Sequence, residues 1–316
     1  MPKEKDVKEK KSTAIFWVDK NGKRIDGRAV SDLRPIKIEA GVLPNVDGSC
    51  YLEWGQNKVL VSVSGPRECL PKHEANPYKA IVRYTYRMAS FSVPDRKNPR
   101  PGRREIEISK VSGEALERAV FLERFPNTAI DVFVEVLDSN AGTRIACLTA
   151  ASVAMADAGI PMRDLVTGIT VGRADGTLIV DLNKHEEDAP DAVDMAVAFL
   201  PNSKEVVLLQ MDGEITPGEF KELNAFAVQE VDKVYELQKE ALKNAFSNKT
   251  PEPIPDFVES LDKPIGDEKT NPDWEEEPKD PFSFDSNDFE QEEENTTLGE
   301  ENLDDAEHEA YDAGKE

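Results

Sequence analysis

Cysteine and histidine are both scarce, because the 316-residue chain holds only three of each. The cysteines Cys50, Cys69 and Cys147 form no CxxC pair, so the sequence indicates neither a disulfide framework nor a thiolate zinc site. No metal-ligand spacing connects the three histidines, and we expect no zinc site built on them. Widely spaced, unpaired thiols are typical of a reducing compartment.

Long hydrophobic runs are also absent. No apolar stretch approaches the ~20 residues that a membrane-spanning helix needs, and the charged start MPKEKDVKEKKS lacks the apolar core of a signal peptide. The motifs GxGxxG, GxxxxGKS/T and HExxH do not occur, which removes the standard dinucleotide-binding, P-loop and zincin interpretations. We therefore expect a soluble, cytoplasmic protein that makes no membrane contact.

The net charge of −24 is distributed unevenly. Residues 251–316 hold 25 acidic and 4 basic side chains, a net of −21, which leaves 38 acidic and 35 basic side chains in the first 250 residues, a net of −3. A nearly neutral body is compatible with nucleic-acid binding. We predict a mobile charged arm over residues 1–14, a folded domain over 15–248 and a disordered acidic tail over 249–316, because the tail has too few aliphatic residues to form a core.

Hydrophobic periodicity within residues 15–248 predicts strands, then a helix, a strand, a second helix, several strands and a last helix. We expect the helices over about 104–123, from about 143 to Gly159, and from the capping box at Thr216–Glu219 to about 246. Hairpin turns are expected at 55–57 and at Asp175-Gly176. This order predicts an α+β fold with a mixed, largely antiparallel sheet.

Basic residues gather in the stretch KNPRPGRREIEISK, residues 97–110, where a helix begins. Arg103 and Arg104 stand at its N-terminus, where the helix dipole favours acidic side chains. Two cations beside free backbone N–H groups suit a phosphate oxyanion. The alternative is surface pairing with Glu105 and Glu107.

A second candidate anion site lies in DSNAGTRIA, residues 138–146, where a strand passes into a helix. Gly142 permits close backbone approach, Thr143 offers a hydroxyl and an N–H group, and Arg144 adds a cation near the helix N-terminus. The alternative is an ordinary strand-to-helix turn that Asn140 caps.

Carboxylates gather in HEEDAPDAVDM, residues 185–195. Asp188 and Asp194 can converge only if the chain turns between them, and Ala189-Pro190 makes a turn there. Converging carboxylates can bind Mg²⁺, or their repulsion can raise one pKa enough for general-acid catalysis. The alternative is a solvated acidic loop.

A basic loop in GPRECLPKH follows another predicted strand. Its side chains Arg67, Lys72 and His73 suit RNA phosphates. The alternative is a plain surface loop.

Several stretches of the chain resemble the RNase PH family, in the family's order, and most resemble the catalytic RNase PH-like subunits of archaeal exosomes. The resemblance covers about residues 15–246. It rests on DGRAVSDLRPIKIEAGVLPNVDGSCYLEWGQNKVLVSVSGPRE, RREIEISKVSGEALERAV, FPNTAIDVFVEVLDSNAGTRIACLTAASVAMADAGIPMRDLV and DLNKHEEDAPDAVDM.

The resemblance implies an RNase PH-like α+β fold, of the ribosomal protein S5 domain 2-like type, and an enzyme that degrades RNA from its 3′ end by phosphorolysis. Inorganic phosphate is then the co-substrate, nucleoside diphosphates are released, and the reverse reaction adds nucleotides to a 3′ end. It also implies Mg²⁺.

The resemblance assigns a role to each candidate residue. Arg103 and Arg104 would bind RNA, with Arg104 also on phosphate. Gly142, Thr143 and Arg144 would hold the attacking phosphate. Asp188 and Asp194 would be catalytic, as general acid or metal ligand, and the basic loop of Arg67, Lys72 and His73 would contact RNA in the pore of a ring.

The implied partners are single-stranded RNA, a non-catalytic RNase PH-like subunit in a hexameric ring of three heterodimers, and RNA-binding cap subunits. The chain departs from the family pattern at Asn140, where many relatives carry Asp, and by the extra carboxylate of Asp191. Two alternatives stay open: a homohexameric RNase PH that trims tRNA 3′ ends, and a non-catalytic ring subunit that only binds RNA.

Overall fold

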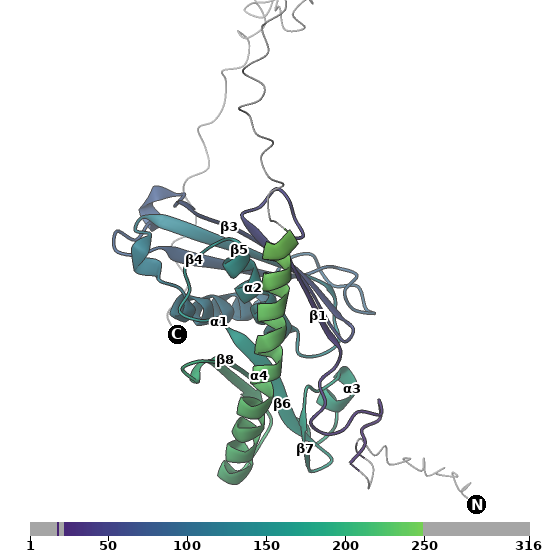
Figure 1. The fold of residues 1–316 in the computed structure, drawn as a ribbon. Coiled ribbons are helices and arrows are strands. Elements are labelled where there is room, and N and C mark those ends of the chain that lie inside the picture. The colour runs from purple at the N-terminus through teal and green to yellow at the C-terminus, as the bar shows by residue number, and fades with distance from the viewer. Residues whose placement is uncertain (1–17, 19–21, 249–316) are drawn as a thin grey trace, which may run out of the picture. The chain divides into compact units, whose positions relative to one another are not determined.

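The computed structural model describes residue 18 and residues 22–248 (Figure 1). Every described residue belongs to one compact unit of the chain, Met1–Glu252. The predicted mobile arm, residues 1–14, and the predicted acidic tail, residues 249–316, lie outside the described residues.

A five-stranded sheet forms one half of the body, in the strand order β1-β2-β3-β5-β4. Only β4 and β5 pair in parallel, and the other neighbours are antiparallel. The strands are β1 (Ile36–Ala40), β2 (Gly48–Trp54), β3 (Asn57–Glu68), β4 (Ile81–Met88) and β5 (Thr128–Asp138).

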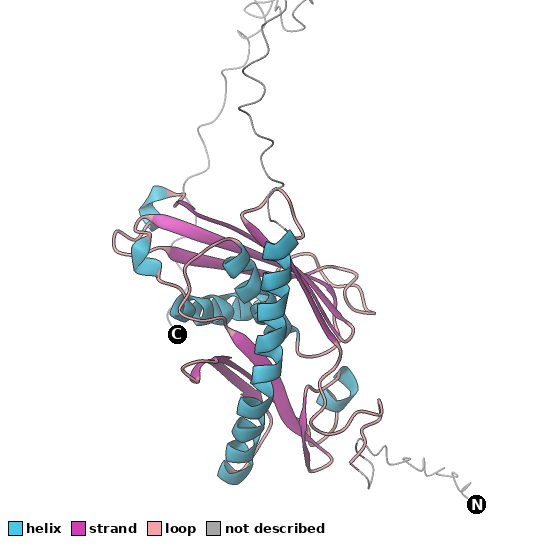
Figure 2. Ribbon diagram, in the orientation of Figure 1, coloured by secondary structure: helices cyan, strands magenta, loops and turns pink. Residues whose placement is uncertain are grey.

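A second, antiparallel sheet of four strands follows in the order β7-β6-β8-β9. Its strands are β6 (Thr167–Ala174), β7 (Thr177–Val180), β8 (Val193–Leu200) and β9 (Glu205–Asp212). The helices are α1 (Arg103–Ala119), α2 (Thr143–Asp157), α3 (Lys184–Glu187) and α4 (Pro217–Asn248), with short 3₁₀ turns at Lys72–Glu74 and Leu122–Arg124. Figure 2 shows the two sheets with the helices packed on them, and the predicted α+β class is confirmed.

The α2 helix lies in the core between the two sheets. It contacts β2 and β3 of the first sheet and β6 of the second, and 13 of its 15 residues are buried. Small side chains make this possible, because alanine lets a helix approach a sheet closely. The long α4 helix runs along both halves, as Figure 1 shows, and contacts β1 and β6.

Most predicted elements are confirmed, and the α1 helix is the main exception. It ends at Ala119, whereas periodicity extended it to 123. Val120 adopts extended backbone and forms a β-bridge with Met162, so a long-range contact stops the helix. The turn at Asp175-Gly176 is confirmed, with φ values of 49° and 69°, as a tight hairpin turn requires.

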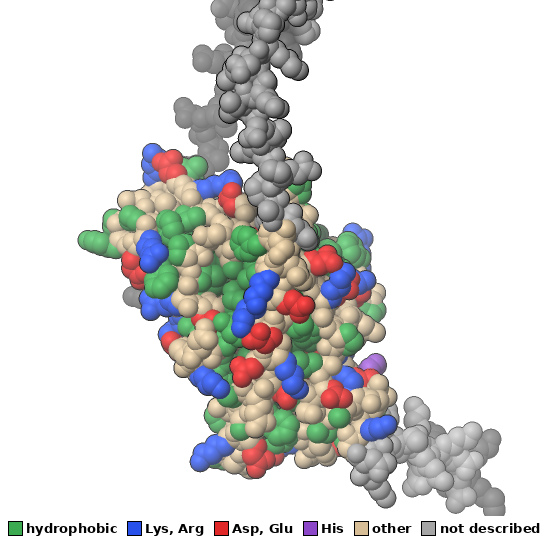
Figure 3. All heavy atoms as spheres, in the orientation of Figure 1, with side chains coloured by type: hydrophobic (Ala, Val, Ile, Leu, Met, Phe, Trp, Pro, Cys, Tyr) green, Lys and Arg blue, Asp and Glu red, His purple; other side chains and the backbone are tan. Residues whose placement is uncertain are grey.

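The surface of the body carries both signs of charge. Figure 3 shows basic and acidic side chains interspersed over one face, which agrees with the small net charge of the first 250 residues. No helix in the described part of the chain is long and apolar enough to cross a membrane.

A fully buried ion pair anchors α3. The Arg24 guanidinium donates to both carboxylate oxygens of Glu186, and it also donates to the carbonyls of Val180 (2.6 Å) and Asp181 (2.8 Å). Both charged side chains are 0% exposed. The segment before β1 therefore holds the end of β7 and the short helix that carries Asp188 at its C-terminus.

Removing one partner of this pair should be costly. We expect Arg24→Met to lower the free energy of unfolding by about 3–5 kcal/mol, because it leaves an uncompensated buried carboxylate. The double variant Arg24→Met with Glu186→Leu should recover most of the loss. Lys37→Met, which breaks an exposed pair with Glu39, is the control and should cost far less, because solvent screens exposed ion pairs. Urea unfolding measures all three, and equal losses for Arg24→Met and Lys37→Met would contradict the prediction.

Candidate active site

The loop between β5 and α2 has an unusual backbone. Ala141 and Gly142 are both left-handed, with φ values of 55° and 67°. Gly142 is the N-cap of α2 and provides no side-chain cap, and the side chain of Asn140, the expected cap in the alternative interpretation, contacts Gln56 and Lys184 instead. The first N–H groups of α2 are therefore available to an anion.

The hydroxyl of Thr143 is oriented by a buried tyrosine. Tyr86 donates a hydrogen bond to Thr143 Oγ1 over 3.1 Å. Burial raises the pKa of Tyr86, and the nearby Cys147 raises it further, so the phenol keeps its proton. With its oxygen engaged as an acceptor, the Thr143 hydroxyl is free to donate its own proton to an anion.

Arg144 is a partly buried cation whose charge is only partly compensated. Its side chain is 19% exposed and its Nη2 lies 3.7 Å from Glu107 Oε1, while its buried Nε has no hydrogen-bond partner among the described residues. Burial lowers the pKa of Arg144, Glu107 opposes this effect, and the positive charge of Arg104 lowers the pKa further. An added anion would stabilise such a cation.

Arg104, in the first turn of α1, lies close enough to Arg144 for the two charges to interact. Its charge acts on Arg144, Asp194 and Tyr86. Arg103 and Arg104 form no ion pair within the described part of the chain, whereas the two acids proposed as their surface partners are engaged elsewhere. Glu105 binds Lys97 and the N–H of Gly102, and Glu107 binds Arg144 and Gln210.

Asp194 lies on β8, opposite Gly172 on one side and Asp212 on the other. Burial, followed by the charge of Glu187, raises its pKa from 3.8 to about 6 against the lowering effects of Arg144 and Arg104. The sheet thus places a carboxyl group beside two arginines. With a pKa of about 6, this carboxyl group can exchange a proton close to neutral pH.

Asp188 differs from Asp194 in its surroundings. It is the C-cap of α3, its side chain is 60% exposed, and it pairs with Lys184 Nζ at 2.7 Å. The chain turns between Asp188 and β8 as expected, yet Glu187 and not Asp188 is the α3 charge that acts most strongly on Asp194. The extra carboxylate of Asp191 accepts from the N–H groups of Asp175 and Gly176 in the β6–β7 turn.

Within the described ranges, no three His, Cys, Asp or Glu side chains are arranged to hold a metal ion. A Mg²⁺ ion would therefore take ligands from bound phosphates as well as from protein carboxylates, which is its usual mode of binding.

The basic loop is separate from this cluster. Arg67 (62% exposed) pairs with Asp47, Lys72 (79% exposed) pairs with Glu68, and His73 follows in the 3₁₀ turn. Arg67 lies within β3 and not in the predicted loop, and Lys72 and His73 follow the strand, whereas its first residue, Asn57, contacts the loop before α2. At strand rise, the two ends of this strand are roughly 30–35 Å apart.

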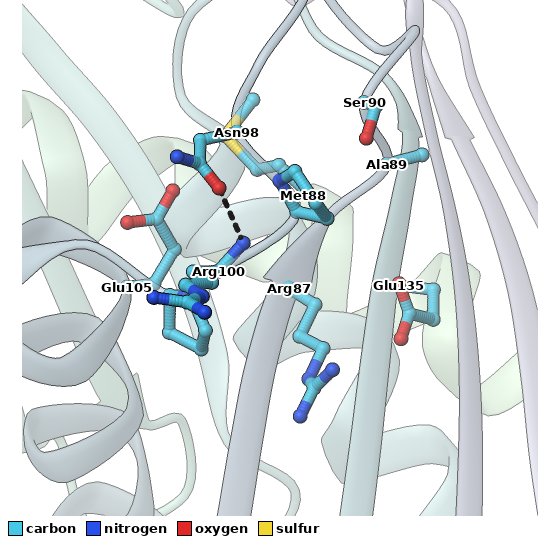
Figure 4. Close-up of a pocket in the computed structure, with 10 residues that line it drawn as sticks. Arg87, Met88, Ala89, Ser90, Asn98, Arg100, Glu105 and Glu135 are labelled. Atoms are coloured by element: carbon cyan, nitrogen blue, oxygen red, sulfur yellow. Dashed lines mark hydrogen bonds between the residues drawn. The ribbon is translucent and has the colours of Figure 1, made fainter.

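A hollow of about 180 Å³ opens beside the start of α1 (Figure 4). Arg87 on β4 and Glu135 on β5 are register partners that lie side by side in one wall, and Arg100 donates its backbone N–H to the side chain of Asn98 in another. Sequence reasoning missed Arg87, Glu135 and Tyr86, and it named Glu107 only as a possible surface partner of Arg103 and Arg104. Only the position of Arg87 and Glu135 near strand ends could have indicated them.

The raised pKa of Asp194 predicts a pH effect on stability. The folded state keeps a proton that the unfolded chain releases between about pH 4 and 6, so this group makes stability fall as pH rises through that window. Asp194→Asn removes the titration, and we expect it to gain about 1–3 kcal/mol relative to wild type between pH 4 and pH 7. Urea unfolding at both pH values measures the difference.

The matched control for the loss of a carboxylate is Asp188→Asn, because the Asp188 side chain is 60% exposed. Parallel pH curves for wild type and Asp194→Asn would contradict the assignment.

Comparison with known proteins identifies two matching family domains. Domain 1 of the 3′ exoribonuclease family matches residues 32–161, and domain 2 matches residues 164–230. The exosome complex component Rrp41 of Thermococcus kodakarensis is 55% identical over 229 residues, which cover 72% of this chain and 92% of that protein. Rrp41 of Nitrosopumilus maritimus is 54% identical over 240 residues, covering 76% and 98%.

Two solved structures share the fold. Rice Rrp46 superposes with a TM-score of 0.63 at 23% identity and covers 70% of this chain and 100% of that one. A chain of the Archaeoglobus fulgidus exosome with RNA bound to the active site gives 0.59 at 22% identity, covering 68% and 92%. The expected RNase PH-like fold is therefore confirmed, and the chain belongs to the 3′ exoribonuclease, or RNase PH, family as a homologue of archaeal Rrp41.

Proposed function

We propose that this chain is the catalytic subunit of an archaeal exosome and degrades RNA from the 3′ end by phosphorolysis. One observation carries the proposal: Arg104, Thr143 and Arg144 stand at two helix N-termini, and the charges of both arginines act on Asp194, a carboxyl group whose pKa is raised to about 6. The first three residues suit an attacking phosphate, and the protonated acid suits a leaving 3′ oxygen.

In the proposed reaction, an oxygen of inorganic phosphate attacks the phosphorus of the last linkage. The bond between that phosphorus and the 3′ oxygen of the preceding nucleotide breaks, and a nucleoside diphosphate leaves. Asp194 donates the proton that the departing 3′ oxygen needs. In reverse, a nucleoside diphosphate extends the 3′ end and inorganic phosphate is released.

Electrostatics explains why arginines are needed. Inorganic phosphate must approach a polyanion, and the cations with the helix dipole offset this repulsion as charge accumulates in the transition state. The N–H groups at the start of α2 and the Thr143 hydroxyl would bind the phosphate oxygens. Arg103, exposed at the start of α1, would bind the RNA backbone.

The proposed Mg²⁺ would use Asp188, with Asp194 as a second ligand when it is ionised. Two carboxylates with substrate phosphates form a donor set that this ion accepts. Bound there, the ion would neutralise charge on the transferring phosphoryl group.

The proposed assembly is a ring of three heterodimers with an inactive RNase PH-like subunit, closed by RNA-binding caps. The relatives named exosome complex components support it. The exposed loop of Arg67, Lys72 and His73 lies far from the proposed phosphate site, and in this assembly it would contact RNA on its way to the site.

Phosphate dependence tests the proposal. Labelled RNA, incubated with the ring reconstituted from this chain and its partner, should be degraded only when phosphate is present, and nucleoside diphosphates should be released. Asp194→Asn should lower the rate by at least about 100-fold while RNA binding persists. Release of nucleoside monophosphates, or degradation that ignores phosphate, would refute phosphorolysis. Unchanged activity in Asp194→Asn would refute the role of Asp194.

The phosphate site has its own test. Arg144→Ala should raise the phosphate concentration for half-maximal rate by about 10-fold or more, because a charge-assisted contact is lost. Arg67→Ala, on the remote basic loop, is the matched control and should weaken RNA binding without changing phosphate dependence. If Arg144→Ala leaves the phosphate half-saturation unchanged, as Arg67→Ala is expected to do, Arg144 does not bind phosphate.

A further inference from the structure

The carbonyl groups of the loop before α2 point into the protein, toward buried donors. Arg34 Nη1 donates to the carbonyl of Asn140, and Arg34 Nη2 lies 3.5 Å from the carbonyl of Ala141. Asn57 Nδ2 donates to the same Ala141 carbonyl over 2.6 Å, and Asn57 Oδ1 accepts from the N–H of Asn140 over 2.5 Å. Arg34 is 8% exposed and Asn57 is 0% exposed.

Arg34 is itself held rigidly by one carboxylate. Asp181, which is 1% exposed, accepts from Arg34 Nε at 3.0 Å, Nη2 at 2.7 Å and the backbone N at 2.7 Å. It also accepts from Trp54 Nε1 at 3.0 Å. The guanidinium plane is thus fixed on one edge by Asp181 and presents its other donors to the loop.

Because the peptide group is planar, a hydrogen bond that fixes the direction of its carbonyl also fixes the direction of its N–H group. In a trans peptide, the C=O of one residue and the N–H of the next point in opposite directions. The donors that bind the carbonyls of Asn140 and Ala141 therefore turn the N–H groups of Ala141 and Gly142 away from the protein interior.

The same contacts hold a backbone that is otherwise disfavoured. Ala141 is left-handed at φ 55°, a conformation that costs free energy for a residue with a Cβ and persists only where its surroundings impose it. The space is also tight, because a Cβ on Gly142 would lie 3.3 Å from Arg34 Nη2.

We propose that Arg34, fixed by Asp181, and Asn57 are positioning residues that aim the backbone N–H groups of Ala141 and Gly142 at the inorganic phosphate. None of them would touch the phosphate, and each acts through the loop carbonyls. The inference rests on the phosphorolytic function proposed above and deepens it.

The loop also reaches the carboxylate side of the site. Asn140 Oδ1 accepts from the backbone N of Lys184 over 3.0 Å, at the first residue of α3. The clamp of Arg34 and Asn57 therefore sets the distance between the proposed phosphate site and the helix that ends at Asp188.

Arg34→Lys tests the clamp while it keeps the buried charge. A lysine ammonium can pair with Asp181, but it cannot bridge a carboxylate and two carbonyls as the guanidinium fork does. The matched control is Arg28→Lys. Arg28 contacts the same Asp181 at 3.1 Å and 3.4 Å, and neither contact involves the loop.

In the reconstituted ring, Arg34→Lys should raise the phosphate concentration for half-maximal rate by about 10-fold, with RNA affinity unchanged. Arg28→Lys should leave the phosphate half-saturation at the wild-type value, even if its melting temperature falls as far as that of Arg34→Lys. A merely structural role for Arg34 would lower the active fraction and not shift the half-saturation.

Asn57→Asp is the second variant, in case Arg34→Lys does not fold. It keeps the acceptor for Asn140 but faces the Ala141 carbonyl with a second acceptor, and it should shift the phosphate half-saturation in the same direction. If wild type depends on phosphate and the folded clamp variants behave like Arg28→Lys, the clamp is refuted and phosphorolysis stands. If wild type ignores phosphate, the proposed function fails and this inference fails with it.

Discussion

The carboxylate of Asp181 is the point on which the two sheets and the candidate site depend. It follows the last residue of β7, in the second sheet, and it accepts hydrogen bonds from Trp54 at the end of β2 and from Arg34 before β1, in the first. A buried charge must be fully satisfied by donors, because an unpaired one is very costly. This requirement forces three distant segments into one arrangement, and the loop before α2 is part of it.

The core supports the same arrangement from the other side. The α2 helix is buried against both sheets, so its N-terminus cannot shift without disturbing the packing of either one. Close packing makes interiors resistant to such shifts. The end of the helix that is proposed to bind phosphate is thus fixed by packing along its length and by hydrogen bonds to the loop that precedes it.

The sequence predicted the local features well and the distant contacts poorly. The β5-to-α2 turn, the hairpin at Asp175-Gly176 and the capping box at Thr216 depend on neighbouring residues, and all three are confirmed. Arg34 and Asp181 are 147 positions apart, and Asn57 and Ala141 are 84 apart. Nothing in the residues next to Arg34 indicates which carbonyls it binds, so only folding shows its place.

The spacing of Asp188 and Asp194 in the sequence left the exposure of the two side chains undetermined. The turn between them was predictable from Ala189-Pro190, but their different exposure was not. Asp194 gains its proton affinity from burial in β8 and from Glu187, whereas Asp188 is exposed beside Lys184. The burial of a carboxyl group depends on what packs over it, which the sequence of one loop does not contain.

The contact between Arg144 and Glu107 has a consequence for which anion can occupy the site. Glu107 offsets part of the charge of Arg144 at 3.7 Å, so an anion at the proposed phosphate site would compete with this carboxylate for the arginine. Coulomb energy scales with charge, so a phosphate dianion gains about twice what a phosphodiester monoanion gains from the arginine. A phosphodiester would only replace one single negative charge with another, whereas free phosphate would bring a second charge to the proposed site.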